Sequence, residues 1–75
     1  MYLGVVIREI RKQKGLTQVE LADRTNISVR TIQRIEKDTV EASIYSLKVI
    51  SKVLEVDFLK IKSEYSMTFI SELLG

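Results

Sequence analysis

The sequence predicts a compact all-α domain of five helices, and three observations carry this prediction. The chain has 75 residues and no proline, so no position is barred from a helix by a missing amide. Apolar residues recur at helical spacing in several windows. Most of these windows follow a Ser, Thr or Asp that can cap a first turn. The length gives room for a single domain, 1–75, and leaves little for a large catalytic cleft.

The first predicted helix covers residues 3–14. Its apolar side chains recur at helical spacing, and the opposite face carries Arg8, Glu9, Arg11 and Lys12. Gly15 follows the last turn, where a left-handed residue commonly ends a helix. These features predict an amphipathic helix that packs one side against a core.

The second predicted helix opens at Gln18 and ends near Thr25. Thr17 can cap it while Glu20, three positions on, reaches back to the Thr17 amide, which is the pattern of a capping box. Asn26 then tolerates the left-handed conformation that a tight turn needs.

The third predicted helix follows the cap Ser28 and runs from Val29 to about Lys37. Only about three residues separate it from the second helix. That connection length is typical of a helix-turn-helix unit.

Two more helices complete the predicted fold. The fourth follows the cap Ser43 and continues to Leu54, and the fifth begins at the cap Asp57 and runs to about Lys62. In the C-terminal extension, residues 63–75, the apolar positions fit either a strand or a helix, and we expect an extra helix.

Composition excludes several classes of function. The chain has no cysteine and no histidine, so disulfides, Cys/His metal sites, thiol nucleophiles and imidazole catalysis are all absent. We therefore expect no enzyme, no metal, no cofactor and no small-molecule ligand. The N-terminal apolar run is too short for a signal peptide or a membrane span, which predicts a cytoplasmic protein with no membrane partner.

Charge is unevenly spread along the chain. Residues 8–37 carry eight Lys or Arg against four acids, giving +4, whereas residues 38–75 carry four against six, giving −2. The first half therefore suits a polyanion and the second does not.

The third helix presents the side chains that a major-groove reader requires. With Ile32 at the centre of the buried face, Arg30 and Arg34 point the opposite way. Arginine can bond both acceptors on a guanine edge, and glutamine can do the same with adenine. We therefore expect residues 28–37 to be a recognition helix for double-stranded DNA, with base contacts from Val29, Arg30, Gln33 and Arg34.

Three runs carry a family resemblance, namely Leu16-Thr17-Gln18-Val19-Glu20-Leu21-Ala22, Asn26-Ile27-Ser28 and Ile32-Gln33-Arg34-Ile35-Glu36. Together they resemble the phage-repressor family of helix-turn-helix proteins, the Cro and Xre type, over residues 3 to about 62. The resemblance implies a five-helix lambda-repressor-like domain, operator binding by paired recognition helices and regulation of transcription. Asn26 and Asp38 stand where this family often has glycine, and both residue types tolerate positive φ.

The resemblance also implies roles for individual residues. Arg11 and Glu36 would form a structural ion pair between the first and third helices. The expected DNA phosphate contacts are Gln18, Thr31, Lys37, Thr39, Ser43 and Arg11.

A single short recognition helix reads too few base pairs to direct regulation, so we expect a homodimer on a pseudo-palindromic operator. The apolar side chains expected at the dimer interface are Phe58, Ile61, Tyr65, Met67 and Phe69. The alternative is that these residues complete the core of one chain.

Three functions share this scaffold: a repressor, a restriction-modification controller and the DNA-binding half of a toxin-antitoxin pair. A protein-interaction adaptor that has lost DNA affinity is the alternative from another class.

Overall fold

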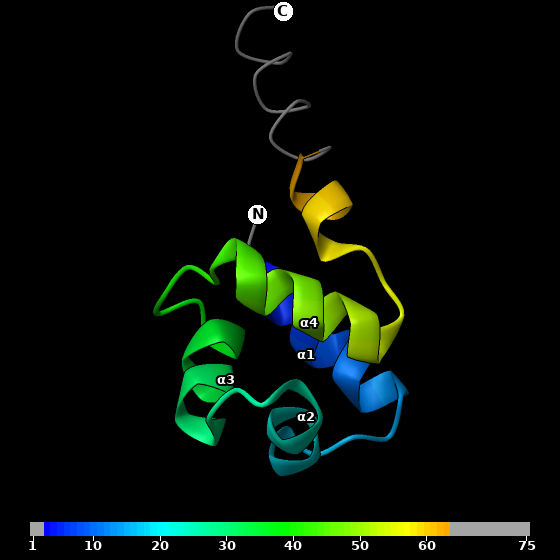
Figure 1. The fold of residues 1–75 in the computed structure, drawn as a ribbon, viewed down its shortest axis with the longest axis vertical. Coiled ribbons are helices and arrows are strands. Elements are labelled where there is room, and N and C mark those ends of the chain that lie inside the picture. The colour runs from blue at the N-terminus through cyan, green and yellow to red at the C-terminus, as the bar shows by residue number, and fades with distance from the viewer. Residues whose placement is uncertain (1–2, 64–75) are drawn as a thin grey trace, which may run out of the picture.

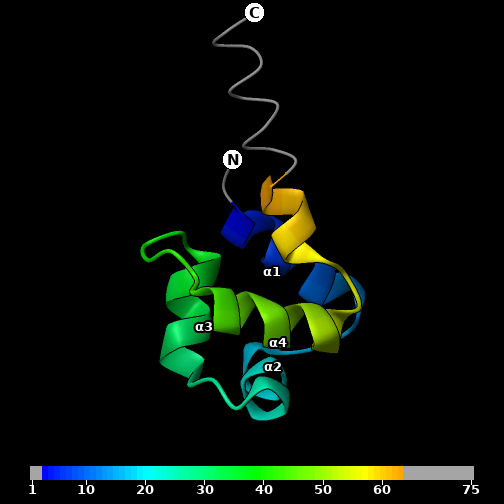
Figure 2. The ribbon, with the colours of Figure 1, turned by 45° about the horizontal axis from the view of Figure 1, so that its top comes forward.

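The structure is a computed structural model that describes residues 3–63, and this range contains helices and no strand. The helices are α1 (Leu3–Gln13), α2 (Gln18–Thr25), α3 (Val29–Glu36) and α4 (Ile44–Leu54), followed by a helical segment over residues 58–63. Figure 1 shows α4 crossing in front of α1, with α2 and the 58–63 segment on opposite sides of α4. The second view keeps this arrangement (Figure 2). The predicted all-α class with five helices is confirmed.

Side-chain caps begin four of the helices, as the sequence predicts, and Asp57 Oδ1 caps the 58–63 segment by accepting from the Lys60 amide at 3.0 Å. Ser28 and Ser43 each accept a hydrogen bond from the amide three residues on. The capping box at α2 is complete, because Thr17 Oγ1 accepts from the Glu20 amide and Glu20 Oε1 accepts from the Thr17 amide, both at 3.0 Å. The hydrogen bond from the Thr17 amide lowers the pKa of the Glu20 carboxyl. This contribution to stability is present at neutral pH and is lost as the pH falls through that lowered pKa.

A residue with positive φ follows each of α1 to α4; after α1 it is Gly15 (φ 73°), as predicted, and after α3 it is Asp38 (φ 57°). Asn26 closes α2 with φ 57°, as predicted, and Glu55 closes α4 with φ 59°. The sequence offers no signal for Glu55, because glutamate has no special tolerance for this conformation. The turn is instead held by its surroundings, since the amides of Glu55 and Val56 both donate to the Ser51 carbonyl.

The core is formed by apolar side chains from all four helices and from the 58–63 segment: Ile7, Leu21, Ala22, Ile32, Ile35, Leu47, Ile50, Leu54 and Phe58. Phe58 is 0% exposed. The assignment of Phe58 to a dimer interface is therefore corrected, because its ring is fully enclosed within one chain. It anchors the 58–63 segment to the rest of the domain.

Gly4 allows the start of α1 to lie against the end of α3. A Cβ at this position would collide with the Ile35 carbonyl oxygen and lie 2.8 Å from Asp38 Oδ1. The Gly4 amide, which has no acceptor within its own helix, donates to Asp38 Oδ1 at 3.0 Å. Asp38 therefore caps α1 from a position 34 residues away in the sequence.

We expect Gly4→Ala to destabilise the protein by about 1–3 kcal/mol, as overpacking usually does. The expected direction of the stability change is opposite to the usual one, because replacing Gly by Ala inside a helix normally stabilises a protein by about 0.5–1 kcal/mol. Urea unfolding followed by circular dichroism measures the change. Val5→Ala is the matched control, since Val5 is next in α1 and 52% exposed. A Gly4→Ala variant as stable as the wild type would show that α1 and α3 are not in tight contact.

Candidate nucleic-acid interface

The turn between α2 and α3 is short and internally bonded. Asn26 reverses the chain, the Ile27 amide donates to the Ala22 carbonyl at 3.2 Å, and Ser28 caps α3 at once. Thr25 is 4% exposed, and its hydroxyl donates to the Leu21 carbonyl at 2.8 Å. These bonds fix α3 relative to α2, as a helix-turn-helix unit requires.

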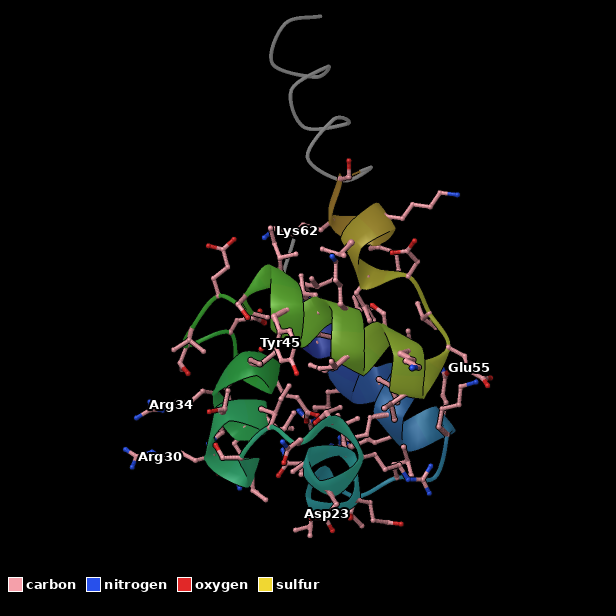
Figure 3. All side chains as sticks on the ribbon, in the orientation of Figure 1. Asp23, Arg30, Arg34, Tyr45, Glu55 and Lys62 are labelled. Atoms are coloured by element: carbon pink, nitrogen blue, oxygen red, sulfur yellow. The ribbon has the colours of Figure 1, made fainter. Side chains whose placement is uncertain are left out.

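The two faces of α3 differ sharply in burial and charge. Ile32, Ile35 and Glu36 are at most 4% exposed and face the core. Arg30 and Arg34 extend side by side away from the domain (Figure 3). Within residues 3–63, neither guanidinium has a hydrogen bond or an ion pair. The outward face of α3 therefore offers two unpaired cations on a rigid support, with exposed Gln33 and Lys37 beside them.

Behind this face, Glu36 accepts hydrogen bonds from two other helices. Arg11 donates through Nε to Glu36 Oε2 at 2.7 Å and through Nη2 to Oε1 at 3.0 Å. Gln18 Nε2 donates to the same Oε1 at 3.1 Å, and Arg11 Nη1 donates to the Leu16 carbonyl at 2.8 Å. The Arg11 and Glu36 side chains are 8% and 2% exposed. This buried pair therefore joins α1, α2 and α3.

The structure places Arg11 in this buried pair, and its expected phosphate contact stays a prediction. Its guanidinium lies inside the domain, and three hydrogen bonds to Glu36 and Leu16 hold it there. These bonds use three of the five N–H groups of the guanidinium, so a phosphate contact would fall to the remaining two. The structural role of Arg11 is the one that the geometry supports.

Gln18 lies between this pair and the outward face of α3. Its Oε1 accepts from Gln33 Nε2 at 3.5 Å, at the long limit for a hydrogen bond, while its amide nitrogen donates to Glu36. The Gln18 side chain is thus oriented by groups on α3. The sequence does not predict this contact, because nothing in the local pattern relates position 18 to position 36.

Hydroxyls at the remaining predicted phosphate positions act as local caps. The Thr31 hydroxyl accepts from Ser28 Oγ at 2.9 Å, and Ser43 Oγ accepts from the Ser46 amide at 3.1 Å. Thr39 Oγ1 donates to the Arg34 carbonyl at 3.1 Å. Lys37 is exposed at the end of α3. These four residues surround the two ends of α3 and the start of α4, and their contact with phosphates stays a prediction.

The loop from α3 to α4 is fixed by Asp38, a role that the sequence does not predict. Asp38 adopts φ 57° and its carboxylate binds the Gly4 amide. The sequence carries part of the signal, because aspartate is one of the residue types that tolerate positive φ. Its partner on α1 cannot be identified from local pattern.

Of the predicted dimer residues, Ile61 is half-buried and packs against the core. Tyr65, Met67 and Phe69 lie outside the described residues, as does the predicted extra helix. Within residues 3–63, no helix has the length and apolar character needed to cross a membrane.

Comparison with known proteins gives a consistent result. A family model described as helix-turn-helix matches residues 7–61. An immunity repressor protein of Bacillus phage phi105 is 33% identical over 67 residues, covering 89% of this chain. An uncharacterised HTH-type transcriptional regulator of Methanothermobacter thermautotrophicus is 41% identical over 52 residues, covering 69% of this chain. The chain spans 46% of the length of the phage repressor and 75% of the length of the archaeal regulator.

Two solved structures have a similar fold. The clp gene regulator ClgR from Corynebacterium glutamicum superposes with a TM-score of 0.75 at 23% identity, covering 97% of this chain and 78% of that one. A mutant of the restriction-modification controller protein C.Esp1396I gives a TM-score of 0.69 at 34% identity, covering 97% and 90%. The first likeness concerns the fold alone, whereas the second extends to the sequence.

Proposed function

The chain belongs to the Cro/C1-type helix-turn-helix family of DNA-binding transcriptional regulators, and from this premise we propose that it binds a pseudo-palindromic operator as a homodimer. Each protomer inserts α3 into the major groove, and the half-sites lie about 34 Å apart, one turn of DNA. Members of this family are regulators and not enzymes.

The observation that carries the proposal is the outward face of α3. Arg30 and Arg34 project in parallel, with no internal partner within residues 3–63 to neutralise them. Solvated surface arginines are common, but these two lie on the second helix of a helix-turn-helix unit. There they are suited to bidentate contacts with guanine edges, with Gln33 suited to adenine and Val29 to a thymine methyl.

The positions of the residues beside α3 support the proposed phosphate contacts. Lys37 and Thr39 follow α3, and Ser43 begins α4, so these residues flank the recognition helix at one end. Gln18 and the free amides at the start of α2 flank it at the other. Such contacts orient the protein on DNA without reading sequence.

Among related functions, the similarities favour a repressor or a controller. One relative is named an immunity repressor and another a restriction-modification controller protein. We propose a role of this repressor or controller type for the present chain. The genes it regulates are identified by selecting bound sequences from a random duplex pool and locating that motif upstream of genes.

Binding to the selected duplex is expected to weaken steeply with salt. Counterion release predicts that log K falls with log salt with a slope of about −0.9 for each phosphate neutralised. Fluorescence anisotropy titrations at salt concentrations between about 50 and 200 mM measure this slope, because affinity changes strongly over that range. Lys37→Ala should make the slope shallower by about two units, because each protomer of the homodimer then neutralises one phosphate fewer. A slope near zero would contradict the proposed phosphate contacts.

The same titration separates a DNA-binding regulator from a protein-interaction adaptor. An adaptor that has lost DNA affinity would fail to bind bulk duplex DNA even at low salt, where charge attraction is strongest. The regulator proposed here binds bulk DNA at low salt and prefers its selected sequence at physiological salt.

A further inference from the structure

Three side chains form a hydrogen-bonded chain from the core to the outward face of α3. Glu36 is 4% exposed on the buried side of α3, Gln18 is half-buried at the start of α2, and Gln33 is exposed. Gln18 Nε2 donates to Glu36 Oε1 at 3.1 Å, and Gln33 Nε2 donates to Gln18 Oε1 at 3.5 Å. We call these three residues together the Gln18 bridge, because Gln18 joins a buried carboxylate to a side chain on the outward face.

The chemistry of Glu36 fixes the direction of both glutamine amides. A carboxylate only accepts hydrogen bonds, so Gln18 must turn its NH2 group toward Glu36. The carbonyl oxygen of Gln18 then faces Gln33, and a carbonyl oxygen also only accepts. Gln33 must therefore turn its own NH2 group toward Gln18. The direction of the exposed amide thus follows from a buried acid two side chains away.

The inner end of the Gln18 bridge is held in place by the core. Glu36 accepts two hydrogen bonds from Arg11, at 2.7 and 3.0 Å, and the Arg11 guanidinium also binds the Leu16 carbonyl. The helices that carry Gln18 and Gln33 pack directly against each other (Figure 2). The outer bond, at 3.5 Å, is at the long limit, and we expect it to strengthen when a base pair excludes water from Gln33.

This geometry decides which groups Gln33 offers to a base. An unrestrained glutamine amide adopts two opposite orientations, because its last torsion is broad and nearly two-fold. With the Gln18 bridge in place, one N–H of Gln33 binds Gln18, and its second N–H and its carbonyl oxygen are left for a base. One donor beside one acceptor is what an adenine edge requires. The opposite orientation would bring two carbonyl oxygens together, and two acceptors form no hydrogen bond.

We propose that Gln18 is a positioning residue for base recognition, which fixes the amide of Gln33 in the direction that favours adenine. The inference rests on the DNA binding proposed above and adds a residue that acts on sequence preference without touching a base. The bridge uses the carbonyl oxygen of Gln18 and one of its two side-chain N–H groups. A phosphate contact is therefore left to the second N–H and to the backbone amides at the start of α2.

Gln18→Met in the full-length chain removes the bridge and keeps the length of the side chain. The measurement is the ratio of affinities for the selected operator and for operators changed at one base pair in both half-sites. Gln33→Ala first identifies the pair that Gln33 reads, which we expect to be A·T. At that pair Gln18→Met should reduce the ratio by about fivefold or more, a size that contacting residues commonly show. Ratios at the pairs read by Arg30 and Arg34 should stay unchanged.

Further variants identify the cause. Gln18→Lys keeps a donor for Glu36 and attracts phosphates, but it offers no acceptor to Gln33. We expect it to lose the same preference although its affinity for all duplexes is kept or rises. In the Gln33→Ala background, Gln18→Met should cause no further loss at this pair, because the residue on which it acts is already gone. Gln13→Met, at an exposed glutamine on α1, is the matched control and should change no ratio. Each ratio compares two duplexes with the same variant, so a change in the folded fraction cancels.

The outcomes separate this inference from the proposed function. A wild-type chain that binds no duplex even at low salt overturns both. The inference alone is overturned if Gln18→Met weakens all duplexes equally, because Gln18 then serves only phosphate binding. An unchanged ratio in Gln18→Lys, or lost preference at several base pairs, also overturns it. The same holds if Gln33→Ala keeps every base preference or if its pair is not A·T. Loss at the Gln33 pair alone, in both Gln18 variants, supports the inference.

Discussion

Glu36→Ala is expected to lower the free energy of unfolding by about 3–5 kcal/mol, because it leaves a buried guanidinium without its counter-charge. Arg11 is 7% exposed and donates two of its hydrogen bonds to Glu36. The same substitution removes the acceptor of the Gln18 side chain. A small domain has a total stability of only about 5–15 kcal/mol, so this loss is large.

Urea unfolding at neutral pH measures the effect, and two further variants identify its cause. Glu41→Ala removes an exposed carboxylate that also pairs with a lysine, and it should leave the unfolding midpoint nearly unchanged. The double variant Arg11→Met/Glu36→Leu removes both charges, and it should recover much of the stability because no charge is left buried. Equal losses in the single and double variants would indicate that packing, and not the stranded charge, is responsible.

The double variant Arg30→Ala/Arg34→Ala is expected to abolish sequence preference while leaving the fold intact. Each arginine contact with a guanine edge contributes about 1–3 kcal/mol of discrimination. In a homodimer the substitutions remove these arginines from both half-sites, so the total effect on operator binding doubles. Both side chains are exposed and have no partner within residues 3–63, so thermal stability should not change.

Titration of the selected operator and of a scrambled duplex of equal length measures this loss. The matched control is the double variant Lys48→Ala/Lys52→Ala. It removes the same charge from two exposed positions on α4. The control should weaken both duplexes slightly and equally. If the arginine variant also lost affinity equally for the two duplexes, α3 would contact only the DNA backbone, and the assignment of base contacts would be wrong.

The sequence was sufficient to predict the elements that depend on local interactions. The start of α2 follows from Thr17 and Glu20, whose side chains and amides lie within one turn of each other. The turn at Asn26 likewise follows from that residue's own conformational tolerance. Helical periodicity also separated the buried side of α3 from its outward side, because the spacing of apolar residues is fixed by the helix itself.

The expected apolar dimer contact shows where such reasoning stops. Phe58 and Ile61 follow the same helical spacing, and periodicity identifies both as apolar positions of one helix. It does not indicate whether they face their own chain or a second one. Phe58 is enclosed by its own core. Ile44 shares the helical spacing of the buried Leu47 and Ile50, yet it is left 65% exposed at the surface.

By itself, then, the sequence determined the helices, their caps, the helix-turn-helix unit and the cationic face of α3, since each depends on residues within a few positions of one another. Only the tertiary structure decided that Glu36 binds Gln18 as well as Arg11, that Asp38 caps α1 and that Phe58 belongs to the core. These contacts join residues 18 to 34 positions apart or depend on how whole helices pack. Their geometry is set by the packing of the complete domain, which no local pattern encodes.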